Sequence, residues 1–519
     1  MSEMRQNQQH NSADEITVPG SDRIYSRKKL LIVMLVPLMM SLLQVSSVNN
    51  ALYSMGQALA ASDSQLQWVL SGYALAYGIV LVPAGRLGDI FGRGSGFVIG
   101  LAIFTLSALG IGLCNDPNLL NILRLVQGAG AGIFSPQTTG IIQQYFQGQA
   151  RARAFALFGL VVSMSVAAGP VMSGGLIALL GGDIGWRASF IINFPLGVIG
   201  IILAFRWLPF AKERRKFGSH KEQTQRQYEA QQTAADREIK PDKPRIDLDP
   251  IGMGLLVVAV VAIMFPFMTH GANWIWGLLP AGVILSVIWV WWEINYQKRG
   301  NEPMVNMNLF KIRTYSYSVA ISTLQFLGAT SIFVVLALFL QNELGTSALQ
   351  VGLVSLPNAL LSAYAAMWAG KRAVEHGRGV QVLSLFVMLA GVLGAVLAAW
   401  LIANGASFWW ITLPITILGF GQGAMGSANQ TQTMLDVPAQ HGGTAGGVQQ
   451  TGQRIATAIG NAIVTAVLLA GSRVTGDPHA WYTGITLSYV LISVILVAAL
   501  VIAIVFWREK YRRSPHPSR

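Results

Sequence analysis

The sequence predicts an all-α polytopic membrane protein with 14 transmembrane helices, and three observations support this prediction. First, the 519-residue chain is 53% hydrophobic and only 11% charged, whereas a soluble domain carries about 25% charged residues. Second, apolar runs near 20 residues, each long enough to cross a bilayer core of about 30 Å, recur along the whole chain. Third, lysines and arginines gather in alternate connecting segments.

Hydropathy divides the chain into six spans, an extra pair and six further spans. The predicted spans are residues 30–51, 67–87, 96–114, 119–143, 153–180 and 187–207, then 250–269 and 275–297, then 315–341, 348–370, 380–403, 407–431, 443–470 and 482–507. The resulting segments are a disordered cytoplasmic N-terminal tail (1–28), an N-terminal six-helix bundle (29–207), a cytoplasmic polar linker (208–249), two extra transmembrane helices (250–298), a C-terminal six-helix bundle (299–507) and a cytoplasmic C-terminal tail (508–519).

The positive charge of the chain follows this topology. With the N-terminus inside, all but four of the 36 lysines and arginines fall in or next to cytoplasmic segments. The exceptions are Arg187 and Arg473 on the outer side and Arg124 and Arg454 within spans. The net charge of +13 therefore reflects the positive-inside rule, and does not predict binding to nucleic acid. Both termini are predicted to be cytoplasmic.

The stretch 81–96, LVPAGRLGDIFGRGSG, separates two predicted spans and combines Gly85, Asp89, Gly92 and Arg93. Glycines let helices turn sharply and approach closely. An acid near a helix start suits the helix dipole, and arginine prefers the cytoplasmic side. The stretch therefore predicts a short loop between two membrane helices.

Part of this loop recurs in the second half of the chain. Ala84–Gly94 reads AGRLGDIFGRG, and Ala369–Gly379 reads AGKRAVEHGRG, with Val374 in place of Asp89 and Glu375 one residue later. Two halves related by a parallel repeat are typical of secondary transporters, in which the substrate site lies between the halves near the membrane midplane. The repeat therefore predicts two six-helix bundles plus two linking helices.

Several stretches together resemble the 14-helix drug:proton antiporter branch of the major facilitator superfamily, the EmrB/QacA-like multidrug exporters. They are WVLSGYALAYG (68–78), the loop at 85–93, LRLVQGAGAG (123–132), AAGPVMSGG (167–175), WRASFIINFPLG (186–197), PMVNMNLFKIRT (303–314) and LGTSALQVGLVSLP (344–357). The resemblance implies a multi-pass protein of the bacterial cytoplasmic membrane, acting as a monomer. It would export hydrophobic or amphipathic small molecules such as drugs, antibiotics and dyes by proton antiport with alternating access.

The resemblance also implies roles for particular residues. Gly85, Asp89, Gly92 and Arg93 match a loop that the family uses as a conformational latch; the alternative role is anchoring of the topology. Arg124, with Asp89, is implied in proton coupling, against the alternative of a structural arginine bonded to backbone carbonyls. Gly169, Pro170, Gly174 and Gly175 match the antiporter motif, which predicts a kinked, closely packed helix, with Ser173 in place of a usual glycine.

One departure from the family pattern concerns the first span. Gln44 stands where this branch commonly carries an aspartate, and none of the predicted spans contains a carboxylate near its middle. With Arg124 and Arg454 inside spans, the centre is predicted to be positive or neutral. Amides facing lipid are costly, so polar and aromatic residues are expected to line the substrate cavity or to join helices. The expected cavity residues are Gln44, Asn49, Tyr73, Tyr77, Gln127, Gln137, Gln325, Phe326, Asn358, Gln422 and Asn429.

The sequence contains no motif that predicts an enzyme, a cofactor site or a metal site. A Walker loop, an HExxH motif and a nucleophile elbow are all missing, and the single cysteine, Cys114, excludes an internal disulfide. The expected partners are a small-molecule substrate, protons and the lipid bilayer, without nucleic acid. Two alternatives stay open: a dedicated exporter of one endogenous metabolite, antibiotic or lipid-like compound, and a non-transporting membrane sensor or scaffold.

Overall fold

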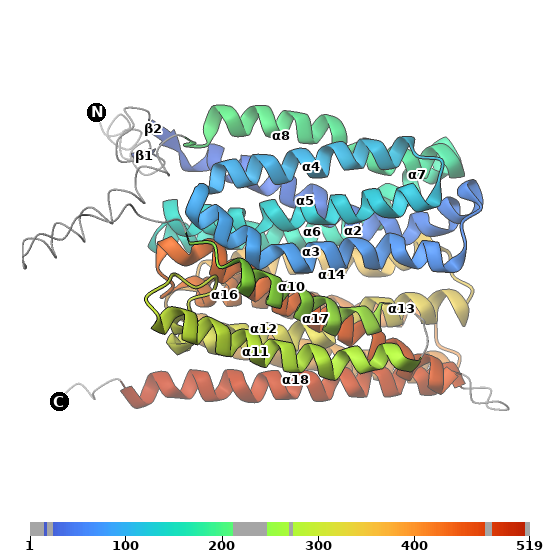
Figure 1. Ribbon diagram of the computed structural model, residues 1–519. Helices are drawn as coiled ribbons and strands as arrows, with labels where there is room; N and C mark the ends of the chain where they lie inside the picture. Colours follow the sequence, from blue (N-terminus) through green and yellow to red (C-terminus); the bar gives the residue numbers. More distant parts are fainter. Residues whose placement is uncertain (1–14, 18–23, 211–246, 269–272, 473–479, 514–519) are drawn as a thin grey trace, which may run out of the picture.

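The computed structural model describes residues 15–17, 24–210, 247–268, 273–472 and 480–513, and it is almost entirely helical (Figure 1). The predicted helical class is thus confirmed. Residues 211–246, which make up most of the predicted polar linker, lie outside the described residues.

The first half of the chain forms a compact group of helices with short connections. These helices are α2 (Arg27–Leu59), α3 (Asp63–Phe91), α4 (Arg93–Leu113), α5 (Pro117–Tyr145), α6 (Gly148–Leu180), α7 (Gly182–Ile191) and α8 (Asn193–Trp207). Helices α7 and α8 follow each other directly and together make one candidate membrane span.

An extra pair and a second group complete the molecule. The pair is α10 (Pro250–Met264) with the 3-10 turn η1 (Phe265–Phe267), then η2 (Asn273–Gly277) and α11 (Leu278–Lys298). The second group is η3 (Met307–Lys311), α12 (Arg313–Ala329), α13 (Ser331–Asn342), α14 (Ala348–Gly370), α15 (Gly377–Ala403), η4 (Phe408–Ile411), α16 (Thr412–Met434), η5 (Ala439–His441), α17 (Gly442–Ser472) and α18 (Ala480–Arg513).

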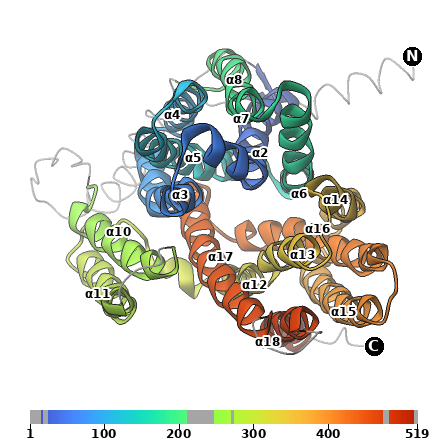
Figure 2. The same ribbon diagram turned by 90° about the vertical axis from the view of Figure 1, so that its right-hand side faces the viewer.

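Viewed along the helices, the two groups lie side by side and the extra pair stands beside them (Figure 2). The halves meet where α3 packs on α17 and where α6 packs on α14. Helix α10 contacts both α3 and α17, while α11 packs mainly on α10. The extra pair therefore covers the α3–α17 contact from outside.

Eleven helical segments in the described part of the chain are long and apolar enough to cross a membrane. Helices α5, α6 and α16 are not among them. In α5 and α16, polar residues such as Gln137 and Asn429 are buried within the helix and lower its hydropathy. The structure thus bears out a multi-pass helical protein, with eleven segments that meet this criterion.

A two-stranded antiparallel sheet precedes the first helix. Strand β1 (Glu15–Thr17) pairs with β2 (Ile24–Ser26), and Ile16 is buried against the first half. These strands lie within residues 1–28, which the sequence predicts as a disordered tail, and the buried Ile16 gives them an apolar contact. The remaining residues before 24 lie outside the described part.

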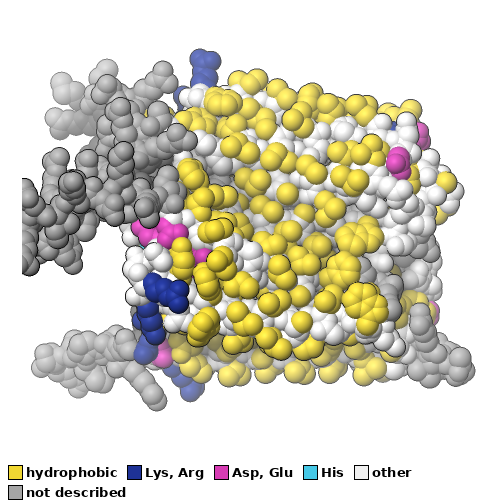
Figure 3. Space-filling view, viewed as in Figure 1, with side chains coloured by type: hydrophobic (Ala, Val, Ile, Leu, Met, Phe, Trp, Pro, Cys, Tyr) yellow, Lys and Arg dark blue, Asp and Glu magenta, His cyan; other side chains and the backbone are white. Residues whose placement is uncertain are grey.

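The surface carries the charge pattern of a membrane protein. A broad hydrophobic band covers the face shown in Figure 3, and lysines and arginines gather at the edge where α2 begins and α18 ends. Acidic side chains are visible at both edges of the band. An apolar belt bounded by charge is what lipid contact requires.

Within each half, glycines allow two helices to approach closely at matching places. An added Cβ at Gly128 of α5 would overlap the carbonyl of Tyr73 in α3, and one at Gly423 of α16 would overlap the carbonyl of Ser362 in α14. Each of these glycines is the middle residue of a Gln-Gly-Ala triplet, which occurs at residues 127–129 and again at 422–424. Small residues at such crossings supply the packing that stabilises helices in lipid.

We expect Gly423→Val to destabilise the protein by roughly 1–3 kcal/mol, since the added atoms would force α16 away from α14. Thermal unfolding of the purified protein in detergent would measure the loss as a lower midpoint. Gly426→Val is the matched control on the same helix, because an added Cβ there meets nothing within 4 Å. Equal midpoints for the two variants would contradict this account of the crossing.

Candidate functional site

The carboxylate of Asp89 joins the two halves at the end of the molecule where α3 finishes. The residue is 2% exposed. Its Oδ1 accepts from the amide of Gly443 at 3.1 Å, and its Oδ2 accepts from the amide and hydroxyl of Thr444, each at 2.8 Å. Asp89 therefore caps the N-terminus of α17, where a negative charge is favoured by the helix dipole.

Arg93 completes this contact from the start of α4. Its guanidinium donates to Asp89 Oδ1 at 2.9 and 2.6 Å. It also donates to the Gln144 side chain at 3.0 Å, to the carbonyl of Gly140 in α5, and to the carbonyl of Ala439 at 2.6 Å. One arginine thus neutralises the buried acid and bonds to both halves. We call Asp89, Arg93, Gly443 and Thr444 the Asp89 cluster.

Gly85 and Gly92, the two glycines predicted for the latch, are needed at their positions for different steric reasons. An added Cβ at Gly85 would lie 2.5 Å from the carbonyl oxygen of Gly443, so only glycine lets α3 cross α17 this closely. Gly92 has φ of 114°, which breaks the chain between α3 and α4 in a conformation that other residues rarely adopt. The structure brings all four predicted latch residues together.

Further bonds tie the halves at the same end. Gln143 of α5 donates to the carbonyls of Met434 and Val437 at 2.9 and 2.6 Å, and Arg151 donates to that of Met434 at 3.3 Å. Arg86 forms an ion pair with Glu302 at 3.1 Å. This end of the interface is therefore held by polar contacts as well as by close packing.

A second polar contact crosses the interface near the middle of the helices. The hydroxyl of Tyr77 lies 2.9 Å from Ser135 Oγ and 3.3 Å from Gln450 Oε1, and Ser135 donates to the same Oε1 at 2.7 Å. Thr451 donates to the carbonyl of Gly78 at 3.3 Å. Of the predicted cavity residues, Tyr77 is thus at the interface of the halves.

Arg124 is buried beside this contact, with 1% exposure. It donates to the carbonyl of Val69 at 2.8 Å and to Gln127 Oε1 at 2.7 Å. Its guanidinium carbon lies 4.4 Å from the centre of the Tyr73 ring. These contacts match the structural alternative for Arg124, and they leave its charge without an acidic partner among the described residues.

A similar contact between an arginine and a tyrosine joins the two halves. Arg454 of α17 lies with its guanidinium carbon 4.5 Å from the Tyr77 ring centre, and the rings of Tyr73 and Tyr77 are 6.0 Å apart. The Tyr73 hydroxyl and the Gln127 amide nitrogen are buried without partners among the described residues. The centre therefore combines two arginines, two aromatic rings and unused polar groups.

Four other predicted cavity residues join helices within one half. In the first half, Asn193 donates to Gln44 Oε1, and Gln137 donates to the Ala84 carbonyl at 2.7 Å. In the second half, Asn358 donates to the Ile415 carbonyl at 2.7 Å, and Gln381 donates to Asn429 Oδ1 at 2.9 Å. Gln325 is buried, Phe326 and Gln422 are half-buried, and the side chain of Asn49 lies outside the described residues.

The antiporter motif packs closely at only one of its glycines. An added Cβ at Gly169 would overlap Ser46 Oγ in α2, whereas one at Gly174 or Gly175 would meet nothing within 4 Å. The expectation of close packing is therefore wrong for Gly174 and Gly175, which face open space. Helix α6 continues through Pro170.

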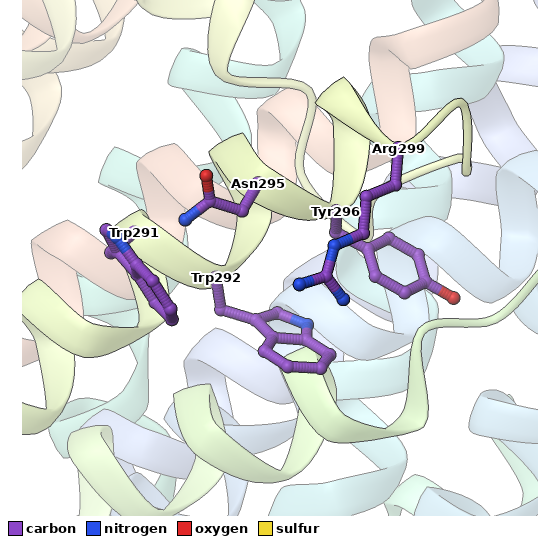
Figure 4. A pocket seen from close by; sticks show the side chains of 5 residues that line it. All are labelled: Trp291, Trp292, Asn295, Tyr296 and Arg299. Atoms are coloured by element: carbon purple, nitrogen blue, oxygen red, sulfur yellow. The ribbon is translucent and has the colours of Figure 1, made fainter.

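A small hollow lies away from this interface, on α11. Figure 4 shows Trp291, Trp292, Asn295, Tyr296 and Arg299 around it. Trp291 is 61% exposed on the surface of the extra pair. The hollow therefore lies apart from the central arginines and tyrosines.

Comparison with known proteins identifies the family. The model of the Major Facilitator Superfamily matches residues 30–461 and, in a second match, 319–519. The chain belongs to the Major Facilitator Superfamily. A solved structure of the superfamily's proton:xylose symporter XylE shares the fold, with a TM-score of 0.63 over 93% of this chain and 95% of that one, at 15% identity.

Curated relatives within the superfamily include named exporters. The "Probable actinorhodin transporter" of Streptomyces coelicolor is 29% identical, over 84% of this chain and 72% of the relative. The "Multidrug resistance protein Stp" of Mycobacterium tuberculosis is 26% identical, over 85% of this chain and 76% of the relative. These names are consistent with the drug:proton antiporter branch of the superfamily.

Sequence reasoning missed the partners that the predicted latch residues contact across the interface. Gly443 and Thr444 are not among the predicted site residues. The signal was present as GGTAGG at 442–447 followed by Gln449-Gln450, which is a small-residue helix face ending in amides. Its meaning depends on which helix lies opposite, and hydropathy does not give that.

We expect Asp89→Asn to loosen the joined end, because it removes a charge that accepts hydrogen bonds worth about 1.5–3 kcal/mol each. Spin labels at exposed Phe91 and Gln440, in a Cys114→Ala background, should report a longer or broader distance distribution. Asp183→Asn is the control, since it breaks an ion pair with Arg187 at the other end of the molecule. An unchanged distribution in Asp89→Asn would contradict the assigned role of the carboxylate.

Proposed function

We propose that this protein is a secondary active exporter of hydrophobic or amphipathic small molecules, driven by proton antiport. The observation that carries the proposal is an interface joined at one end by the buried Asp89 cluster, with Arg454 of the second half lying against Tyr77 of the first half and Arg124 buried against Tyr73. Such an interface can open and close as a unit, as alternating access requires. The names of the relatives support drugs and antibiotics as substrates.

The proposal includes 14 membrane spans. Helices α5, α6 and α16 run alongside the eleven apolar segments (Figures 1 and 2), and the polar residues of α5 and α16 face other helices rather than lipid. With α7–α8 and α12–α13 each counted as one span, the extra pair adds two spans to two sets of six. The lysines and arginines at the edge where α2 begins favour a cytoplasmic location for both termini, and the exporter would act as a monomer.

In this scheme the Asp89 cluster closes the cytoplasmic end. Opening that end requires α17 to lose the cap that Asp89 provides. The carboxylate then loses its bonds to Gly443 and Thr444 and keeps only its contact with Arg93. Protonation of Asp89 would lower the cost of that step, while Arg124 of α5 lies nearer the start of α3, against Val69 and Tyr73. Asp89→Asn should then abolish proton-driven export while the protein stays folded and inserted.

A dedicated exporter of one compound is the second candidate. It is favoured by the name of one relative, a probable transporter of actinorhodin. Five of the eleven predicted cavity residues bond within one half, which leaves a smaller set of groups to recognise substrate. A narrow substrate range would suit that small set.

A deletion strain tested against a panel of toxic dyes and antibiotics separates these functions. We expect sensitivity to several unrelated compounds, restored by the wild-type gene and not by Asp89→Asn. Sensitivity to a single compound would favour the dedicated exporter. Unchanged sensitivity and unchanged accumulation of every compound would exclude both and favour a sensor or scaffold.

The central charges predict a preference among substrates. A dication in a desolvated site needs a compensating acid, whereas this centre presents Arg124 and Arg454. We expect poorer efflux of dicationic dyes than of neutral, zwitterionic or anionic compounds. Monocations stay possible, because an aromatic face contributes about 0.5–2 kcal/mol. Equal efflux rates for matched dicationic and neutral compounds in loaded cells would contradict this prediction.

A further inference from the structure

Two buried carboxylates lie together in the extra helix pair, outside the interface of the halves. Asp249 precedes α10 and Glu293 lies near the end of α11, and both residues are 0% exposed. Carboxylates are rarely buried in this way unless a positive group or a proton compensates them.

Each carboxylate uses only one oxygen in hydrogen bonds. Asp249 Oδ1 accepts from the amide of Gly252 and from the Trp292 indole, both at 2.9 Å. Glu293 Oε2 accepts from the amide of Val305 at 3.3 Å. The other oxygens, Asp249 Oδ2 and Glu293 Oε1, are buried and form no hydrogen bond of normal geometry in the described part of the chain, although the Trp289 indole and the Met304 backbone lie close to the Glu293 carboxylate.

The two unused oxygens lie on the same side of one glycine. An added Cβ at Gly252 would overlap Asp249 Oδ2 and would lie 2.9 Å from Glu293 Oε1. The distance between the oxygens cannot exceed the sum of their distances to that point. The two oxygens therefore lie within 5.2 Å of each other, beside the space that the absent side chain of Gly252 leaves open.

No positive side chain compensates this pair within the described residues. Neither carboxylate forms an ion pair. The neighbouring acid Asp247 accepts from the Tyr296 hydroxyl at 2.7 Å and from the amide of Glu302 at 3.2 Å, and Arg86 pairs with Glu302. The ionisable groups nearest the pair are Asp247 and Tyr296. Arg299 lies beside Trp292 and Tyr296, and Glu302, paired with Arg86, follows in the next connection.

We propose that Asp249 and Glu293 form a proton-binding site in which the two carboxylates share one proton. Two desolvated like charges this close cannot both stay ionised. One shared proton removes one charge and converts the two unused oxygens into a donor and an acceptor, so both gain a partner. A metal ion is disfavoured, because the described residues hold no group of three or more potential ligands.

The site is connected to the joined end of the interface. Glu293 accepts a hydrogen bond from the amide of Val305, which lies in the connection between α11 and η3. Glu302 lies in the same connection and forms an ion pair with Arg86 of α3. Asp89 lies one turn further along α3. Loss of the proton would leave two negative charges next to each other in the α10–α11 pair. Their repulsion would strain the connection between α11 and η3.

Infrared spectroscopy of the purified full-length protein in nanodiscs tests the proposal directly. We expect a carbonyl-stretch band of a protonated carboxyl group at neutral pH, shifted in heavy water and lost as the pH rises. Glu293→Gln and Asp249→Asn should each remove the band. Asn is chosen at position 249 because it tolerates the left-handed backbone conformation found there (φ 45°). Glu375→Gln, at an exposed carboxylate, is the matched control and should keep the band.

Three results would contradict the proposed proton-binding site. Absence of such a band in the wild type, or its persistence in both variants, would exclude a shared proton. A band that responds to added calcium or magnesium and not to pH would show a cation site instead. These measurements involve no transport, so they stand or fall separately from the proposed export function.

Thermal unfolding against pH provides a second readout if either variant folds poorly. A proton held by the native state and released on unfolding makes stability fall as the pH rises. We expect the wild-type unfolding midpoint to decrease from mildly acidic to mildly alkaline pH, and the decrease to be smaller in whichever variant folds. An equal pH dependence in the wild type and that variant would contradict the proposal.

Discussion

The cap that Asp89 provides to α17 is the interaction on which the contact between the halves depends at one end. A carboxylate from one half satisfies the first amides of a helix in the other half, and Arg93 compensates its charge. Because both groups are buried, removing either one leaves the other uncompensated, which costs far more than the pair contributes when intact. A contact of this kind favours two discrete states over a gradual separation.

The internal repeat places a related crossing on the other side of the interface, and the two crossings differ in chemistry. Gly85 packs on Gly443, and the repeated Gly370 packs on Ala156 of α6, where an added Cβ would overlap that side chain. At the second crossing no carboxylate takes the place of Asp89, since Glu375 is exposed and lies beside His376. Both crossings are close, but only the α3–α17 crossing joins close packing to a buried charge.

Charge is distributed in an unusual way for a protein that would handle protons. The centre holds Arg124 and Arg454 stacked on tyrosines, while the buried acids lie at the Asp89 cluster and in the extra pair. Asp249 and Glu293 are separated from the central arginines but connected to α3 through Val305, Glu302 and Arg86. The extra pair is therefore more than a spacer between repeats, because it adds buried ionisable groups next to the crossing that Asp89 holds.

The sequence by itself determined the helical membrane class and the repeat, because hydropathy, charge bias and glycine spacing are local properties of the chain, and its resemblance to a transporter family singled out Gly85, Asp89, Gly92 and Arg93. It also determined that Gln44 stands in place of an acid. Only the tertiary structure decided what each polar residue contacts: Gln44, Gln137, Asn358 and Asn429 join helices within a half, while Tyr77 and Gln450 bond across the interface. It also decided that Asp249 meets Glu293, which are 44 residues apart in sequence. A buried polar group is defined by its neighbours from other helices, and those neighbours are set by packing that no single segment encodes.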